Sequence, residues 1–374
     1  MLSKWEVVSF VDEVFLSSQL CLATKEYKVS LSKQQLQDFG VCFIGPVLAH
    51  YFRWLGEQVS QYGVDNLLFL AREGYFLKQG YERLRYQGLV PDIQTHYLLA
   101  SRTFLYRAML DRPECWELAL QGAFSGNLKQ LCEKRLGLMN SEVDSIFSPA
   151  QKAMEVVLPD DKEKVIRVFK EHVSRLAACA QPTKDAYLRY SAPMLSSPGS
   201  ALVDLGYSGT IQKLITLLHG TDTRGFYWIA TRAGEVEVGQ CRARMHGALK
   251  EGVALGQGYI PLDRSLFLEA VLTSPNGQLK NISVNSSGKI QMTYGGLTHV
   301  QRHFHELEVI MAGAMSYAED MLRSDVVVTG QDVENIYAAM IKSFSNLSAE
   351  LKKLFDIDDD NAGLGVINPL TVFA

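Results

Sequence analysis

The stretch "SALVDLGYSGTIQKLI", residues 200–215, decides the fold. Its first residues are apolar and predict a short buried strand, and Asp204 stands where this strand ends. Two glycines and two hydroxyl residues follow, and a helical pattern then begins near Thr210. The order is that of a strand, a tight turn and a helix. Because ligands of open α/β sheets bind at the carboxyl ends of the strands, the turn is also a candidate site.

The turn has the composition of a phosphate-binding loop. Gly206 and Gly209 let backbone N–H groups approach an anion, since no Cβ stands in the way. Ser208 and Thr210 add hydroxyl donors, and the start of the helix adds partial positive charge. Asp204 suits the vicinal hydroxyls of a ribose, or a Mg²⁺ ion bridging them. The alternative is a plain turn in which Asp204 caps the helix, and this segment alone favours neither interpretation.

Two further strand ends carry arginine. In "FLAREGYF", residues 69–76, Arg72 and Glu73 directly follow an apolar run, and in "ASRTF", residues 100–104, Arg102 follows the next one. Guanidinium groups bind phosphate or pyrophosphate through two hydrogen bonds, so the convergence suggests a ligand with two phosphate-bearing ends. Glu73 could act as a general base or a metal ligand. Alternatively, Arg72 and Glu73 pair with each other at a sheet edge.

The predicted fold is α/β, with a core of parallel strands that a helical insertion splits in two. Helical periodicity without a convincing strand marks residues 111–195 as the inserted lobe. A hairpin pattern covers residues 280–294, and two long helical segments are expected over 297–322 and 331–355. Along the chain we expect an N-terminal helical segment (1–60), the first part of the core (61–110), the lobe (111–195), the second part of the core with the phosphate-binding loop (196–255) and a mainly helical C-terminal region (256–374).

Composition excludes several classes of protein. A net charge of −4 argues against a general nucleic-acid surface, although a local cluster of arginines could still hold one small anion. The six cysteines are scattered without a CxxC pair, so we expect reduced thiols. No secretory signal is visible at the start, and the apolar runs are too short to form a transmembrane segment. A cytoplasmic protein is therefore expected.

The segment "LVDLGYSGT", residues 202–210, resembles the loop with which phosphoribosyltransferases bind the 5-phosphate and ribose hydroxyls of phosphoribosyl pyrophosphate. That family usually has two adjacent acidic residues in this loop, whereas here Asp204 is followed by Leu205. The resemblance implies a phosphoribosyltransferase-like core and a requirement for Mg²⁺ together with the donor.

Three motifs together, "LFLAREGYFL", "YLLASRTFLYRA" and "VDLGYSGTIQKL", resemble bacterial polysaccharide phosphoribosyltransferases over residues 35–275. Such a region often follows a phosphatase domain of the haloacid dehalogenase type. The nucleophile motif of that domain is D-x-D followed by a small hydroxyl residue at a strand end, and neither "FVDEVF" nor Asp204 supplies it. The resemblance implies a glycosyltransferase that passes 5-phosphoribofuranose to a polysaccharide or oligosaccharide acceptor. It also implies a separate phosphatase partner and a location peripheral to the inner membrane through the acceptor.

The site residues follow from this resemblance. Displacement at the anomeric carbon passes through an oxocarbenium-like state with charge growing on the departing pyrophosphate, which arginine and Mg²⁺ stabilise. The expected catalytic residues are Arg72, Glu73 and Asp204, with Asp204 also the Mg²⁺ ligand, and the expected substrate-binding residues are Gly74, Tyr75, Arg102, Gly206, Tyr207, Ser208, Gly209 and Thr210.

Other interpretations stay open. The chain could be a non-catalytic glycan-binding module or a phosphatase-associated accessory protein, with a purely structural glycine loop. Transfer of ribose phosphate to a small base is a further possibility. Glu269, in "RSLFLEAVL", is a second candidate carboxylate, for which a solvated helix position or pairing with Arg264 is the favoured interpretation.

Overall fold

The computed structural model describes residues 31–343, 347–359 and 365–369. Within these residues, six strands form one sheet in the order β2–β1–β5–β6–β8–β7. Neighbours from β2 to β8 are parallel, and β7 is antiparallel to β8. The expected α/β architecture with a mostly parallel sheet is therefore confirmed. The strands are β1 Asn66–Leu70, β2 Gln94–Leu98, β5 Ser200–Asp204, β6 Thr223–Ala230, β7 Gly234–Val238 and β8 Cys241–Glu251.

The winding of the sheet reverses between β1 and β5. The chain leaves β1 through α4 (Gly74–Tyr86) to β2, and returns later to β5 on the other side of β1. From β5 it continues through α12 (Thr210–His219) to β6. The register pairs Phe69 with Val203, so β1 and β5 end side by side. Such a switch point is where open sheets bind ligands.

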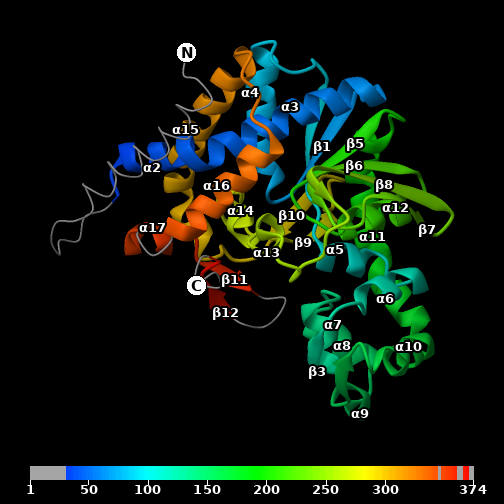
Figure 1. Cartoon of the computed structure of the whole chain (residues 1–374). Coiled ribbons are helices and arrows are strands. Elements are labelled where there is room, and N and C mark those ends of the chain that lie inside the picture. The colour runs from blue at the N-terminus through cyan, green and yellow to red at the C-terminus, as the bar shows by residue number, and fades with distance from the viewer. Residues whose placement is uncertain (1–30, 344–346, 360–364, 370–374) are drawn as a thin grey trace.

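Alternation along β1 divides the core into two layers. Leu67 and Phe69 belong to the hydrophobic cluster with α3, α4 and α15, whereas Leu68 and Leu70 pack with α5, α11 and α12. Side chains on a strand point alternately to the two faces, so a continuous apolar strand is covered on both sides. Figure 1 shows these helices around the sheet. Their bounds are α3 Gly45–Tyr62, α5 Arg102–Ala108, α11 Val173–Leu195 and α15 Phe304–Arg323.

The inserted lobe is mainly helical, as expected, but it also contains a small sheet. Phe124 of β3 (Phe124–Asn127) pairs with Leu158 of β4 (Glu155–Leu158) in an antiparallel ladder. The expectation of a lobe without strands is wrong in this respect, because four-residue strands are too short to give a clear periodicity. The lobe projects from the rest of the chain beyond α5 (Figure 1). Its helices are α6 Pro113–Ala119, α7 Leu128–Lys134, α8 Asn140–Ile146, α9 Pro149–Lys152 and α10 Lys162–Glu171.

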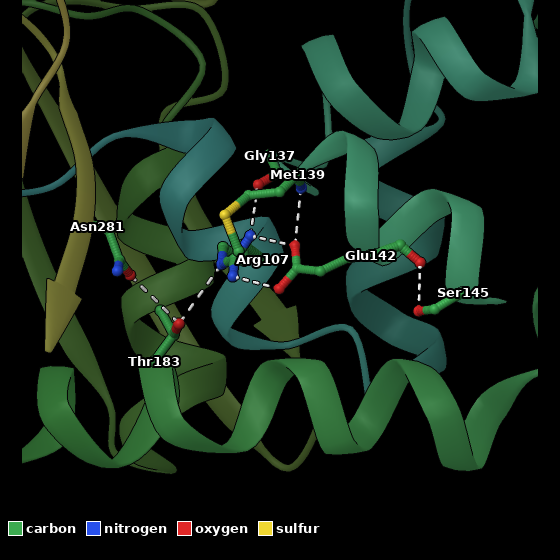
Figure 2. A network of polar contacts seen from close by, with 7 residues as sticks. All are labelled: Arg107, Gly137, Met139, Glu142, Ser145, Thr183 and Asn281. Carbon is green, nitrogen blue, oxygen red and sulfur yellow. Dashed lines mark hydrogen bonds and ion pairs between the residues drawn. The ribbon is translucent and has the colours of Figure 1, made fainter.

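A buried ion pair joins the lobe to the core (Figure 2). Arg107, at the end of α5, makes two parallel hydrogen bonds to the Glu142 carboxylate of α8, at 2.7 and 2.8 Å. The same guanidinium donates to the Gly137 carbonyl at 2.7 Å and to the Thr183 hydroxyl of α11 at 3.4 Å. Thr183 in turn donates to Asn281 at 3.4 Å. One guanidinium therefore connects α5, α8 and α11.

The two terminal regions pack together rather than forming separate units. Helix α15 contacts both α2 and α3, so the expected N-terminal helical segment and the C-terminal region share one core. The hairpin is confirmed, whereas the expected helix over 331–355 is divided into α16 and α17, with residues 344–346 outside the described part. In the described part of the chain, no helix is both long and apolar enough to cross a membrane. The remaining elements include α2 Lys33–Phe39, a π-helical turn Gly40–Ile44, α13 Ile260–Asp263, α14 Leu266–Val271, β9 Leu279–Val284, β10 Ile290–Tyr294, a 3₁₀ turn Val300–His303, α16 Gly330–Ser343, α17 Ala349–Lys353, β11 Ile357–Asp359 and β12 Gly365–Ile367.

The Arg107–Glu142 pair provides the first prediction. Glu142→Ala leaves the guanidinium, whose side chain is 8% exposed, without its carboxylate partner. Removing one member of a buried pair destabilises by about 3 kcal/mol. We therefore expect a lower urea midpoint for unfolding of the lobe. Hydrogen exchange of the backbone amides in α8 and α11 measures this unfolding. The control is Glu133→Ala, which breaks a solvent-accessible pair with Lys129 and should change stability by less than about 1 kcal/mol. Equal midpoints for the two variants would contradict this role of Arg107.

Candidate functional site

A cavity of about 260 Å³ lies at the carboxyl ends of β1, β2 and β5. The switch point therefore carries a cavity, as the topology predicts. Its lining combines the expected residues with a segment that no motif had marked, which includes residues 274 and 276–279 and is joined by Tyr294. The expected residues that line it are Arg72, Glu73, Arg102, Asp204, Gly206, Tyr207, Ser208, Gly209 and Thr210.

Gly74 and Tyr75 were expected to bind substrate, but they are not among the lining residues. Helix α4 begins at Gly74, which is buried so close to β1 that a Cβ would stand 2.7 Å from the backbone of Phe69. The Tyr75 ring packs edge-on against Tyr97 and Phe304, at 5.9 and 5.8 Å between centroids. Adjacency in sequence to the cavity residues misled the prediction, because the helix turns these two positions toward the core.

The loop before α12 has the geometry of an anion site. Gly209 adopts a left-handed conformation with φ of 64° and precedes Thr210, the first residue of the helix. The first-turn N–H groups of any helix have no intrahelical acceptor. Among the described residues, no side chain caps this helix, so a bound anion could accept from these N–H groups. The hydroxyls of Ser208 and Thr210 lie 3.0 Å apart. The Tyr207 carbonyl accepts from the Thr231 amide at 2.8 Å, which ties the loop to the end of β6.

Lys213 lies behind this loop and was not predicted. It is 4% exposed, and its ammonium donates to the Ser208 carbonyl at 2.9 Å. Burial, followed by repulsion from Arg232, lowers the pKa of Lys213 to about 8. The sequence contains a usable signal, since Lys213 interrupts an apolar helix one turn after Gly209. The lysine fixes the loop and adds positive charge close to it.

Asp204 ends β5 at the base of the cavity. Burial, and next the charge of Glu73, raise its pKa to about 7. Backbone hydrogen bonds from Gly206 and Leu205, together with the charge of Arg102, act in the opposite direction. Gly206 permits this arrangement because a Cβ there would stand 2.9 Å from the Asp204 carboxylate. An aspartate held this way can accept hydrogen bonds from a ligand or bind a cation once it is ionised.

Glu269, on α14, also lines the cavity. Burial and the charge of Glu73 raise the pKa of its carboxyl to about 8, whereas Arg102 and Arg72 lower it. Glu269 is half-buried on the cavity wall, where it is close enough to Glu73 and Asp204 for their charges to act on it. The sequence could not reveal this, because α14 lies 65 residues after Asp204 and only the fold brings the two together.

The arginines face these carboxyl groups from the ends of β1 and β2. Arg102 is exposed at the start of α5, and Arg72 follows a cis peptide bond after Ala71. Glu73 accepts a hydrogen bond from the backbone N–H of Arg72 at 3.0 Å, which is not a bond to the guanidinium. Both charges act on Glu269, so anionic and cationic groups share one cavity. Such a cavity suits a ligand that has hydroxyl groups as well as phosphates.

Magnesium is compatible with this donor set only as part of a ligand complex. Within the described residues, no group of three or more His, Cys, Asp or Glu is placed to hold a metal ion. Mg²⁺ prefers oxygen ligands and is commonly held by one or two carboxylates together with phosphate oxygens of the substrate. Asp204 and Glu73 supply carboxylates of this kind on the cavity wall. They fit an ion that arrives with a phosphate ligand.

The anion site can be tested with a pair of glycines. Both Gly209 and Gly63 have φ near +60°, so alanine at either position carries a strain of about 1 kcal/mol. Only at Gly209 would the Cβ meet another residue, the sulfur of Met245 at 2.2 Å. We expect Gly209→Ala to weaken binding of ribose 5-phosphate at least tenfold in calorimetry. Gly63→Ala should leave this affinity unchanged, and similar losses in both variants would exclude a specific effect at the loop.

A third prediction concerns pH. Because the pKa of Glu269 is raised from 4.5 to about 8, the folded protein keeps a proton that the unfolded chain releases between these values. Stability should therefore fall as the pH rises through this window. Glu269→Gln removes this proton uptake, so its Tm should exceed that of the wild type at pH 8 and approach it near pH 5. The same substitution at exposed Glu57 serves as the control, and a Tm difference for Glu269→Gln that is independent of pH would contradict the burial of the carboxyl.

No model of a known protein family matches the chain. No curated protein matches it significantly in sequence. The comparisons thus assign neither a family nor an activity. The function must be argued from the cavity and from the motifs that line it.

Proposed function

We propose that the chain is a phosphoribosyltransferase that passes 5-phosphoribose from phosphoribosyl pyrophosphate to a hydroxyl group of a glycan. The observation that carries the proposal is the convergence of an anion loop, two arginines and a buried aspartate at the switch point of the sheet. An ordinary turn capped by Asp204 would need neither the arginines nor a cavity. The resemblance of the three motifs to polysaccharide phosphoribosyltransferases supports the same activity.

Each phosphate-bearing end of the donor suits a different group of cavity residues. Its 5-phosphate suits the loop around Gly209, where N–H groups of α12 and the hydroxyls of Ser208 and Thr210 act as donors. Its pyrophosphate suits the guanidinium groups of Arg72 and Arg102. The ribose hydroxyls between them would donate to Asp204. The volume of about 260 Å³ is slightly below the ~300–1,000 Å³ typical of ligand pockets.

The reaction forms a bond between the acceptor oxygen and the anomeric carbon, and breaks the bond from that carbon to pyrophosphate. Arg72 and Arg102 offset the charge that grows on the leaving group. Mg²⁺, when bound with the donor, supplies further positive charge at the same oxygens. Glu73 takes the proton of the acceptor hydroxyl, because one of its oxygens is already held by the Arg72 amide and the carboxylate is thereby oriented. Pyrophosphate leaves with both electrons of the broken bond.

The proposal also places the protein in a reaction sequence. The acceptor is a growing surface glycan, so the enzyme would act in the cytoplasm beside the inner membrane. The product keeps a 5-phosphate on its ribofuranose. A phosphatase, such as one of the haloacid dehalogenase type, must act next if the mature glycan contains plain ribofuranose.

The test is pyrophosphate release from phosphoribosyl pyrophosphate and Mg²⁺, with and without oligosaccharide acceptors. We expect release that depends on the acceptor, and a drop of ~10²–10³-fold in kcat/KM for Arg72→Ala and for Asp204→Asn, the loss typical of removing one transition-state contact. Arg242→Ala is the matched control, because Arg242 is exposed on β8 and pairs with Glu235 at 3.1 Å. Its activity should be unchanged.

Other outcomes separate the alternatives. Tight binding of a glycan without turnover would favour a non-catalytic or phosphatase-associated module. Formation of a nucleotide from a free base would favour base transfer. Full activity of both Arg72→Ala and Asp204→Asn would reject the assigned site.

A further inference from the structure

Part of the cavity wall differs in charge from the rest. The sheet ends contribute Arg72, Arg102, Glu73 and Asp204, whereas residues 274–279, "SPNGQL", have no charged side chain. Tyr294, at the end of β10, completes this neutral wall. We refer to residues 274–279 and Tyr294 as the hairpin wall. The hairpin wall offers a phosphate no opposite charge, so it suits an uncharged part of a ligand better than the sheet ends do.

The hairpin wall is held firmly by buried polar groups. Gln301, which is 3% exposed, donates to the carbonyls of Ser274, at 2.8 Å, and of Asn276. The Ser274 hydroxyl donates to the Asn276 carbonyl at 3.0 Å, and the Gly295 amide donates to the Gln278 carbonyl at 2.8 Å. These bonds engage backbone carbonyls. The side chains of Asn276 and Gln278 line the cavity, and the Gln278 Oε1 also accepts from the Lys280 ammonium at 3.3 Å. A preorganised surface of this kind loses little entropy when it binds.

The hairpin wall also has a fixed position beside the residues that we propose bind phosphoribosyl pyrophosphate. The Ser101 hydroxyl donates to the Leu279 carbonyl at 3.1 Å and accepts from the Phe104 amide at 3.2 Å. Ser101 immediately precedes Arg102, so one serine ties the start of β9 to the strand end that carries an arginine. A molecule bound at the hairpin wall would therefore lie next to the donor.

The side chains on this wall are those that recognise sugars. The amides of Asn276 and Gln278 both donate and accept hydrogen bonds, as sugar hydroxyls do. The half-buried ring of Tyr294 offers an apolar face together with a hydroxyl, which suits the C–H face of a pyranose. Asn276, Gly296 and Leu297 are exposed, so the wall reaches the protein surface. A polymer could leave the cavity along this side, whereas a free base would need no such exit.

We propose that the hairpin wall binds the terminal, uncharged sugar residue of the acceptor glycan, with Asn276 and Gln278 bonding its hydroxyls and Tyr294 packing on its ring. This inference rests on the proposed function and names the acceptor subsite of the same cavity. The remainder of the glycan lies outside the cavity, on the side where the hairpin wall reaches the protein surface at Asn276. Acceptor and donor thus bind on separate groups, and their affinities should respond to different substitutions.

The test uses the full chain on an array of neutral oligosaccharides with terminal hexose, deoxyhexose or N-acetylhexosamine. A bound oligosaccharide is then titrated in solution against the wild type, Asn276→Ala and Tyr294→Ala. We expect at least tenfold weaker glycan binding for each variant, and affinity for phosphoribosyl pyrophosphate with Mg²⁺ within twofold of the wild type. Arg72→Ala should show the reverse pattern. The matched control is Gln291→Ala, since Gln291 is exposed on β10 and does not line the cavity.

Several results would overturn the inference. Glycan affinities within twofold of the wild type for both Asn276→Ala and Tyr294→Ala would do so while leaving donor binding, and hence the proposed function, intact. A wild-type chain that binds the donor but no oligosaccharide on the array would also reject the subsite. If the wild type binds no donor at all, the proposed function fails as well. Asn276 is exposed, so its variant remains informative even if Tyr294→Ala does not fold.

Discussion

The parallel pairing of β1 with β5 is the constraint on which the cavity depends. Their register sets Phe69 opposite Val203, so the two segments that follow these strands begin side by side. One of them carries Arg72 and Glu73, and the other carries Asp204 and the loop into α12. Because the winding reverses at this point, the crossover helices diverge and leave room for a ligand. A slip of one residue in this register would turn Leu67 and Phe69 to the wrong face, so the core also fixes the site.

Sequence patterns predicted the parts of the fold that depend on local order. The apolar runs that became β1, β2, β5 and β6 are each followed by a polar turn and a helix or a further strand, and these were recognised. The antiparallel β7 and its partner β8 were not, although "GEVEV" alternates as an edge strand does. The lobe strands β3 and β4 were not predicted, because each is a strand only through its pairing with the other. Pairing across 30 residues leaves no periodic signal in either segment.

The candidate site also consists of residues that the sequence predicted and residues that only the structure reveals. Arg72, Arg102 and the loop around Gly209 were predicted, since each directly follows a strand and parallel strands end at one edge. The structure brings Glu269 to them from α14, and the hairpin wall from the segment before β9. Neither has a motif, because a carboxylate on a short helix and a neutral loop are common on any surface. Their role depends on what faces them, and this is a property of the tertiary structure alone.

Under the proposed function, the charges of the cavity favour binding of the donor together with a metal ion. Phosphoribosyl pyrophosphate is strongly anionic, and Glu73, Asp204 and Glu269 would repel it once they are ionised. Burial and, next, the charge of Glu73 raise the pKa of Asp204 to about 7 and that of Glu269 to about 8, so the ionised forms of both carboxyl groups are disfavoured. A divalent cation held by carboxylate and pyrophosphate oxygens would offset the repulsion among the carboxylates and the repulsion between carboxylates and donor, and it would leave the carboxylates ionised. Under the proposed function, a shared cation would add to the attraction that Arg72 and Arg102 already exert on the donor.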